Sequence, residues 1–164
     1  MSDLFSNNHY HYLHNNGIDS KKIKKLDLSD WNTSRVIDMS SMFYMCESLE
    51  KINLSGWNTS NVQNMMMMFE ECYSLEKLDL SDWDVSNVTD MSEMFHWCRS
   101  LKELDLSGWD ISKVTNITWM FFNCESLKKL NLTGWDTSKI TNTAWASQMF
   151  RKCNKSIIPD WYYK

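Results

Sequence analysis

A tryptophan recurs through this chain every 26 residues, and no other feature constrains its fold as strongly. The residues around it recur as well, as in LDLSGWDISKVTNITWMFFNCESLKK, residues 104–129. A fixed period of this length indicates repeats, in which each unit buries its apolar side chains against the next. Five repeats are recognisable, and their tryptophans are Trp31, Trp57, Trp83, Trp109 and Trp135, with Trp161 at the same spacing.

Within one repeat the apolar positions predict a short helix followed by a short strand. Residues 65–72 are apolar at i, i+3, i+4 and i+7, the spacing of one helix face. Residues 75–80 read L-x-x-L-x-L, the strand signature of leucine-rich repeats. We therefore predict an α/β fold: a leucine-rich-repeat-like solenoid with one short parallel β-strand and one short helix in each 26-residue coil.

An Asp or Asn precedes each predicted helix. Its side-chain oxygen can accept a hydrogen bond from a free backbone N–H of the first turn, so we interpret these residues as helix N-caps and not as catalytic carboxylates. The positions are Asp38, Asn64, Asp90, Asn116 and Asn142.

The ends of the chain depart from the template, and we expect one repeat domain over residues 1–164. Residues 1–25 keep only fragments of the motif and predict a degenerate N-terminal cap. Residues 26–142 hold the regular repeats, and residues 143–164 an irregular last coil and a C-terminal cap. Pro159 falls near the expected last strand, where it cannot donate a ladder hydrogen bond, so it suits an edge at which stacking stops.

The phrases LDLSGWD, TSNV, DMSSMF and ESLKKLNL resemble the 26-residue repeats of the BspA-like leucine-rich-repeat family. These repeats are abundant in surface lipoproteins of mycoplasmas and other bacteria, and the similarity is strongest over residues 20–142. The resemblance implies a repeat scaffold with an adhesion or interaction role.

Composition and charge exclude some function classes. The formal charge of −4 provides no basic surface for nucleic acid, and no apolar run approaches the length of a membrane-spanning helix. The first residues have no basic region followed by an apolar one, so an intracellular location or a place within an assembly is favoured over secretion. No sequence motif of a known catalytic site or cofactor-binding loop is present, which predicts a protein that is not an enzyme and needs no cofactor.

The cysteines and histidines could suggest a disulfide or metal site, but their arrangement favours neither. One cysteine occupies the same position in each helical segment, without any CxxC pair, which predicts buried reduced thiols. His9, His11 and His14 form an H-x-H-x-x-H cluster, for which a polar cap is a better interpretation than a zinc site. We predict no metal site.

The most informative variation lies on the predicted outward face of the helices. Solvent would favour charged residues there, whereas aromatic and methionine side chains recur and would form an apolar patch typical of an interface. Alternatively, some of them fold back between neighbouring helices as additional core. The residues are Tyr44, Met45, Met66, Met67, His96, Trp97, Trp119 and Phe122.

A second candidate surface is the exposed face of the strands, where Asp or Asn and Ser or Thr alternate in columns. An evenly repeated column is typical of a hydrogen-bonded or solvated ladder, although its uniformity would also suit a repetitive ligand such as a glycan. The column consists of Asp27, Asn53, Asp79, Asp105 and Asn131.

These observations lead to one main hypothesis and two alternatives. The chain is expected to be a non-enzymatic protein–protein interaction module. It could instead be a structural or self-assembling component of a larger assembly such as a virion or surface layer. A glycan-binding adhesin is the third possibility.

Overall fold

The computed structural model describes residues 20–141 and 148–163. Its strands are β1 (Lys25–Asp27), β2 (Lys51–Asn53), β3 (Glu103–Asp105) and β4 (Lys129–Asn131). Three short 3-10 helices accompany them: η1 (Ser20–Lys22) precedes β1, and η2 (Lys155–Ile157) and η3 (Asp160–Tyr163) end the chain.

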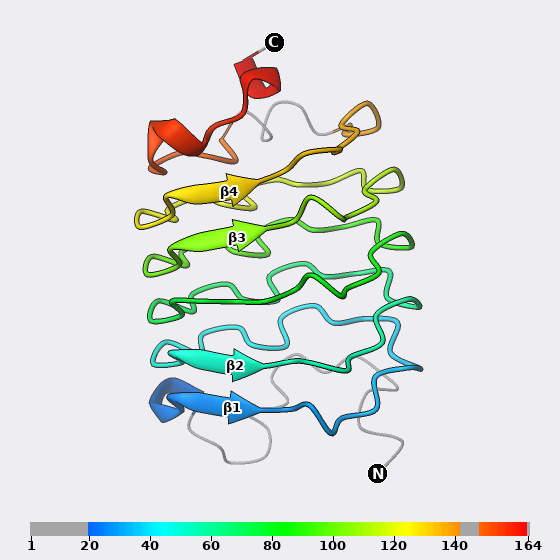
Figure 1. Cartoon of the computed structure of the whole chain (residues 1–164), viewed down its shortest axis with the longest axis vertical. Coiled ribbons are helices and arrows are strands. Elements are labelled where there is room, and N and C mark those ends of the chain that lie inside the picture. The colour runs from blue at the N-terminus through cyan, green and yellow to red at the C-terminus, as the bar shows by residue number, and fades with distance from the viewer. Residues whose placement is uncertain (1–19, 142–147, 164) are drawn as a thin grey trace.

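Successive 26-residue repeats lie one above another, with the strands on one side (Figure 1). Strand β1 pairs in parallel with β2, and Leu26 lies opposite Ile52. Strand β3 pairs in parallel with β4, and Leu104 lies opposite Leu130. Each partner is the residue at the same position of the next repeat, so the sequence period sets the register.

The strands do not form one continuous sheet, because the repeat between β2 and β3 has no assigned strand. At that point the backbone contact from the Glu76 nitrogen to the Glu50 oxygen is 3.5 Å long, at the limit of a hydrogen bond. Among the described residues, β-structure therefore consists of two two-stranded sheets and of isolated parallel bridges such as that between Asp38 and Asn64.

The predicted helix is wrong, and with it the α/β leucine-rich-repeat-like solenoid. Residues 20–141 and 148–163 contain no α-helix, and most of them lie in turns, bends and irregular backbone. In a helix the Phe69 N–H would donate to the carbonyl of Met65; instead it donates to Met94 of the next repeat at 2.9 Å. The N–H of Met68 donates to the carbonyl of Met65, which closes a four-residue turn.

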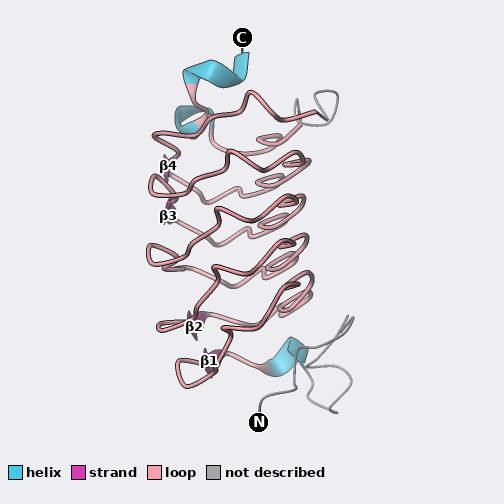
Figure 2. Ribbon diagram, turned by 90° about the vertical axis from the view of Figure 1, so that its right-hand side faces the viewer, coloured by secondary structure: helices cyan, strands magenta, loops and turns pink. Residues whose placement is uncertain are grey.

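This alternation continues through each such segment, which we call the turn segment (residues 39–46, 65–72, 91–98 and 117–124). One N–H donates to the next repeat and the following N–H closes a turn, so the backbone donors are satisfied without a helix. The apolar spacing 65, 68, 69 and 72 marks buried positions correctly, because two consecutive turns place these side chains inward as a helix would. The turn segments lie on the side opposite the strands (Figure 2).

The predicted N-cap residues occupy the starts of these turn segments. Asp38 accepts a hydrogen bond from the Ser40 N–H at 2.8 Å, and Asn64 accepts one from Met66 at 3.0 Å. These side chains thus accept a backbone N–H as predicted, but the segment that they begin is a turn and not a helix. The fifth predicted cap, Asn142, lies outside the described residues.

The core consists of columns of identical side chains that stack along the molecule. Phe69 and Phe95 stack at 5.8 Å between ring centroids, and Phe95 and Phe121 at 5.5 Å, with near-parallel planes. The repeat tryptophans Trp57, Trp83, Trp109 and Trp135 are buried, and the Trp57 indole N–H donates to the Leu28 carbonyl at 2.9 Å. The columns thus combine apolar burial with satisfied polar groups.

Four of the five cysteines, Cys46, Cys72, Cys98 and Cys124, are buried as predicted and form another inward column, whereas Cys153 is half-buried. Cys98 donates to the Phe69 carbonyl at 3.2 Å, and Cys124 to the Phe95 carbonyl at 3.1 Å. Burial raises the pKa of both thiols. A buried neutral thiol of this kind is a packing group and a poor nucleophile.

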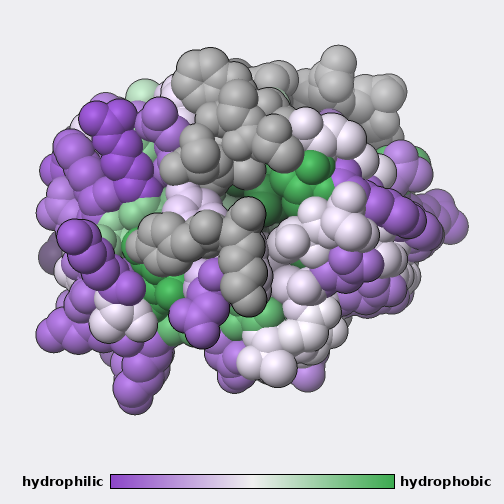
Figure 3. Space-filling model, turned by 90° about the horizontal axis from the view of Figure 1, so that it is seen from above, coloured by the Kyte–Doolittle hydropathy of each residue, from purple (hydrophilic) through white to green (hydrophobic). Residues whose placement is uncertain are grey.

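The last repeat ends differently from the others. Where a strand would follow β4, the chain forms η2 and η3, with Pro159 between them. Seen from this end, hydrophobic residues show in the middle and hydrophilic residues surround them (Figure 3). Most of the predicted N-terminal cap, including His9, His11 and His14, lies outside the described residues.

Candidate interaction surface

The turn segments bring four of the predicted surface residues into ring contact. We call His96, Trp97, Trp119 and Phe122 the aromatic cluster. The His96 ring stacks on Trp119 at 5.9 Å and meets Phe122 edge-on at 5.2 Å and Trp97 edge-on at 6.1 Å. Two adjacent repeats supply these side chains, so stacking assembles the cluster.

All eight predicted patch residues are half-buried, and none is fully exposed. Tyr44, Met45, Met66 and Met67 belong to the two repeats below the aromatic cluster. The sequence allowed two interpretations, an exposed apolar patch or additional core between the repeats. The structure lies between them, because the side chains pack partly on one another and remain partly accessible.

The backbone at several of these residues is left-handed, which sequence reasoning did not anticipate. Met67, Trp97 and Trp119 have φ of 58°, 63° and 53°. Each occupies the third position of a turn, which requires a positive φ and favours Gly or Asn. A bulky residue at such a position stores strain, and stacking of the repeats holds it in place. Several strained positions of the turn segments therefore present large aromatic or apolar side chains at the surface, although Glu71 and Glu93 share the same backbone conformation.

Cationic and phenolic side chains extend the aromatic cluster. The Arg99 guanidinium lies over the Trp97 ring at 4.3 Å and over the Tyr73 ring at 5.3 Å, both within the range of cation–π attraction. The Tyr73 hydroxyl donates to Glu71 at 2.6 Å. Burial and this carboxylate raise the pKa of Tyr73 to about 12. Both residues were missed in the sequence because Arg and Tyr at a turn carry no recognisable pattern.

Two carboxylates lie beside the aromatic cluster, and they were missed for the same reason. His96 Nδ1 is 2.8 Å from Glu70 Oε1 and 3.6 Å from Glu93 Oε2. Glu70 is only 6% exposed. Burial and the nearby Glu70 raise the pKa of Glu93. The pKa of Tyr44 is raised as well, by burial and by Glu70, Glu71 and Glu93. Two carboxyl groups, those of Glu70 and Glu93, are thus largely withdrawn from water at this part of the surface.

The alternative surface, the strand-side column, is engaged in hydrogen bonds within and between repeats. Asn53 donates to Asp27 at 3.1 Å, and Asn131 donates to Asp105 at 3.2 Å. Asp79 accepts from both the backbone and the hydroxyl of Ser81. Such bonds to the ionised form lower the pKa of Asp27, Asp79 and Asp105. The column thus forms a turn-stabilising ladder.

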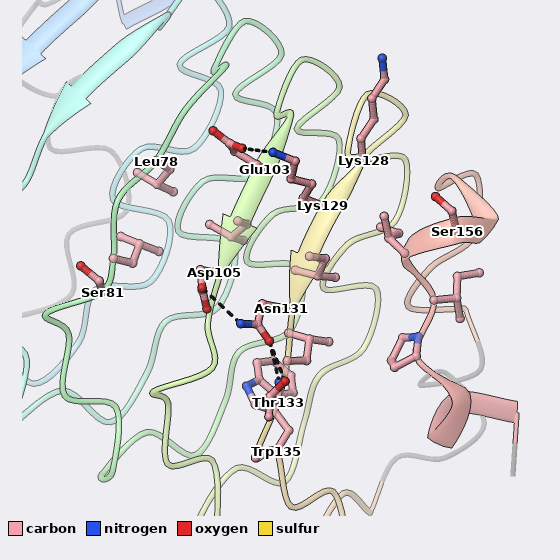
Figure 4. Close-up of a pocket in the computed structure, with 18 of the residues that line it drawn as sticks. Leu78, Ser81, Glu103, Asp105, Lys128, Lys129, Asn131, Thr133, Trp135 and Ser156 are labelled. Carbon is pink, nitrogen blue, oxygen red and sulfur yellow. Dashed lines mark hydrogen bonds and ion pairs between the residues drawn. The ribbon is translucent and has the colours of Figure 1, made fainter.

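A groove of about 900 Å³ lies on the strand side, between β3 and β4 and the C-terminal residues 156–161 (Figure 4). Its lining is mixed, with Leu104 and Leu130 beside Asp105 and Lys129. The figure shows Ser156 across from β4, with an open space between them. Within residues 148–163 no strand pairs with the free edge of β4, and this edge therefore faces the groove.

No helix within residues 20–141 and 148–163 has the length and hydropathy to cross a bilayer.

Comparison with known proteins gives a family without a described activity. The sequence matches the family described as Mycoplasma protein of unknown function, DUF285, over residues 1–129 and again over residues 76–161. Neither the curated proteins nor the solved structures contain a match to this chain. The two matched stretches overlap and together span most of the sequence, as expected for a repeated unit. The chain belongs to the DUF285 family.

Proposed function

We propose that this protein is a non-enzymatic protein–protein interaction module and that the aromatic cluster is the centre of its binding surface. The observation that carries the proposal is the half-buried group of His96, Trp97, Trp119 and Phe122 with Arg99 over the Trp97 ring. Trp, Tyr and Arg dominate binding energy at protein interfaces, and here they gather at one place.

The variation among repeats supports the same surface. Core and strand-side positions repeat the same residue types, whereas the corresponding turn-segment positions differ, as at Glu70, His96 and Phe122. A partner can therefore recognise this place as distinct from the rest of the molecule. We also infer that the repeat is of the BspA-like type, since the phrases quoted above follow that pattern, and proteins of this type have interaction and adhesion roles.

The test replaces three of the left-handed patch residues by asparagine, in the triple variant Met67→Asn, Trp97→Asn, Trp119→Asn. Asparagine tolerates a positive φ, so the backbone of the turns is preserved while the large side chains are lost. The matched control is Glu103→Gln, Lys129→Gln, which removes an exposed ion pair of 3.4 Å on the strand side. Near-UV circular dichroism verifies folding of both.

Both variants and the wild type are used to isolate binding proteins, and each captured protein is then purified and its affinity measured. We expect wild type and control to bind it equally, and the triple variant at least ~30-fold more weakly, since a hot-spot residue contributes about 2 kcal/mol or more. Equal binding by a folded triple variant would contradict the proposal.

Self-assembly is a second candidate function, and the open side of β4 favours it. In the described residues β4 pairs with β3 alone, so its other edge faces the groove. A strand of a second copy could add there. Light scattering of the wild type and of Ile158→Lys, which places a charge in the groove, tests this. An oligomer that the variant dissociates supports self-assembly, whereas a monomeric wild type excludes it.

A further inference from the structure

Glu70, Glu93 and His96 converge on one point beside the aromatic cluster. One ligand-type atom from each lies within 4.8 Å of the others. The three residues come from two adjacent repeats, because Glu70 is the counterpart of His96 in the repeat before. The convergence therefore depends on stacking and has no signature in local sequence.

The charges of this group are not balanced. Within the described ranges, His96 is the only basic side chain at ion-pair distance from Glu70 or Glu93. Glu70 is almost fully buried and Glu93 is half-buried. Two carboxylates so close together and withdrawn from water repel each other and lose hydration, and a single imidazolium compensates one of them at most. A divalent cation would compensate both.

The separations also suit a metal ion. Ligand atoms around a tetrahedral zinc ion, at bond lengths near 2.0–2.1 Å, lie roughly 3.3 Å from one another. His96 Nδ1 lies 2.8 Å from one carboxylate oxygen and 3.6 Å from the other, on either side of that value, and the two carboxylates lie within 4.8 Å of each other. Small side-chain movements would thus convert the present contacts into coordination.

The imidazole is oriented by its surroundings before any ion binds. Trp119 stacks on one face of the ring, and Phe122 and Trp97 meet it edge-on. Rings packed in this way restrict rotation of His96 and keep Nδ1 directed toward the carboxylates. Such support around the first ligands is typical of sites with useful metal affinity.

We propose that Glu70, Glu93 and His96 form a binding site for one divalent transition-metal ion, of which Zn²⁺ is the natural probe. One nitrogen and two oxygen donors leave further coordination positions to water. The imidazole ligand favours zinc and its neighbours over Mg²⁺ and Ca²⁺, which prefer oxygen ligands alone. His96 belongs to both this site and the aromatic cluster, but metal binding needs no protein partner and is measured on the protein alone.

The experiment uses the full chain with His9→Asn, His11→Asn, His14→Asn, so that the N-terminal histidines cannot bind the probe. Metal-free protein is titrated with zinc chloride by isothermal calorimetry, and separately with cobalt chloride by visible absorption. Glu93→Gln and His96→Ala are tested in this background. Glu76→Gln is the matched control, because it also neutralises one carboxylate, at an exposed position paired with Lys102.

We expect one Zn²⁺ per chain, visible cobalt absorption bands of a low-symmetry site, and no binding of Mg²⁺. Affinity should fall ~100-fold or more in Glu93→Gln and His96→Ala and stay unchanged in Glu76→Gln. Absence of saturable zinc binding in the background that lacks the three N-terminal histidines but keeps His96 would overturn the proposal. Unchanged affinity in Glu93→Gln would do so as well, and this half-buried position keeps the test valid if His96→Ala does not fold.

Discussion

The strand side and the turn side of this protein are built from the same repeats but use repetition differently. On the strand side, corresponding residues are nearly identical and bond to one another, as Asn131 does to Asp105. On the turn side, the backbone repeats while side chains change, so that Glu70 and His96 occupy corresponding positions and bond across repeats. Repetition thus supplies the framework, and substitution within it supplies local chemistry.

The largest expected effect is a difference in stability between a core substitution on the turn side and one on the strand side. Phe95→Ala removes a ring stacked between two others at a fully buried position, so we expect a loss of about 3–5 kcal/mol of unfolding free energy. Leu130→Ala, half-buried beside the groove, should lose less, about 1–2 kcal/mol. Urea denaturation measures both. Equal losses would mean that the turn-side column is not the main support of the stack.

A second comparison concerns the two kinds of tryptophan. Trp57→Phe removes the indole hydrogen bond to the Leu28 carbonyl, which keeps only the Trp31 N–H as a donor, and also shrinks a buried ring, so we expect a loss of about 1–3 kcal/mol. Trp97→Phe on the turn side keeps an aromatic face for Arg99 and should lose only about 0.5 kcal/mol. Thermal denaturation of the two variants provides the test, and the reverse order would refute this assignment of roles.

The turns that follow the strands offer a smaller but well-matched pair. Gly56 has φ of 80° and so resists any side chain, whereas Gly108 has an ordinary φ and free space around its Cα. Gly56→Ala should destabilise the protein by about 1 kcal/mol. Gly108→Ala should stabilise it by about 0.5 kcal/mol, because alanine lowers the conformational entropy of the unfolded chain. Opposite signs in chemical denaturation would confirm that corresponding glycines differ in backbone role.

The smallest expected effect is a pH dependence of opposite sign on the two sides. The pKa of Asp105 is lowered in the folded state, so its contribution to stability is present above the unfolded value of about 3.9 and is lost as pH falls through the folded pKa. The pKa of Glu93 is raised, so its contribution is present below about 4.3 and is lost as pH rises through the folded pKa.

Denaturation of metal-free protein between pH 3 and pH 7 (roughly the carboxyl titration range) separates the two. Asp105→Asn should flatten the loss of stability in acid, whereas Glu93→Gln should be relatively more stable near neutral pH than in acid. If both variants changed the profile in the same direction, the difference in environment between the two carboxylates would be refuted.

Much of the buried interior follows from the sequence. The inward positions 65, 68, 69 and 72 were predicted as one apolar stripe and are all buried. The helix was wrong because periodicity records which side chains point inward and not where each backbone N–H donates. Here alternate N–H groups donate to the next repeat, as Phe69 does to Met94, and a local pattern contains no trace of that long-range bond.

The candidate site was predictable only in part. The aromatic residues His96, Trp97 and Trp119 could be recognised in the sequence because they differ from the residues at the corresponding positions of the other repeats. Glu70 and Glu93 gave no such signal, since a carboxylate at a surface position is ordinary. Their significance comes from burial and from the distance to His96 across two repeats.

By itself, the sequence determined the 26-residue period, the register of corresponding residues and the identity of the core columns, because each repeat carries the same inward side chains. Only the tertiary structure decided that the turn segments are not helices and that, within residues 148–163, 3-10 helices take the place of a further strand. It also decided that Glu70, Glu93 and His96 meet at one point. Backbone hydrogen bonds between repeats and the burial of charge depend on neighbours that are distant in the chain.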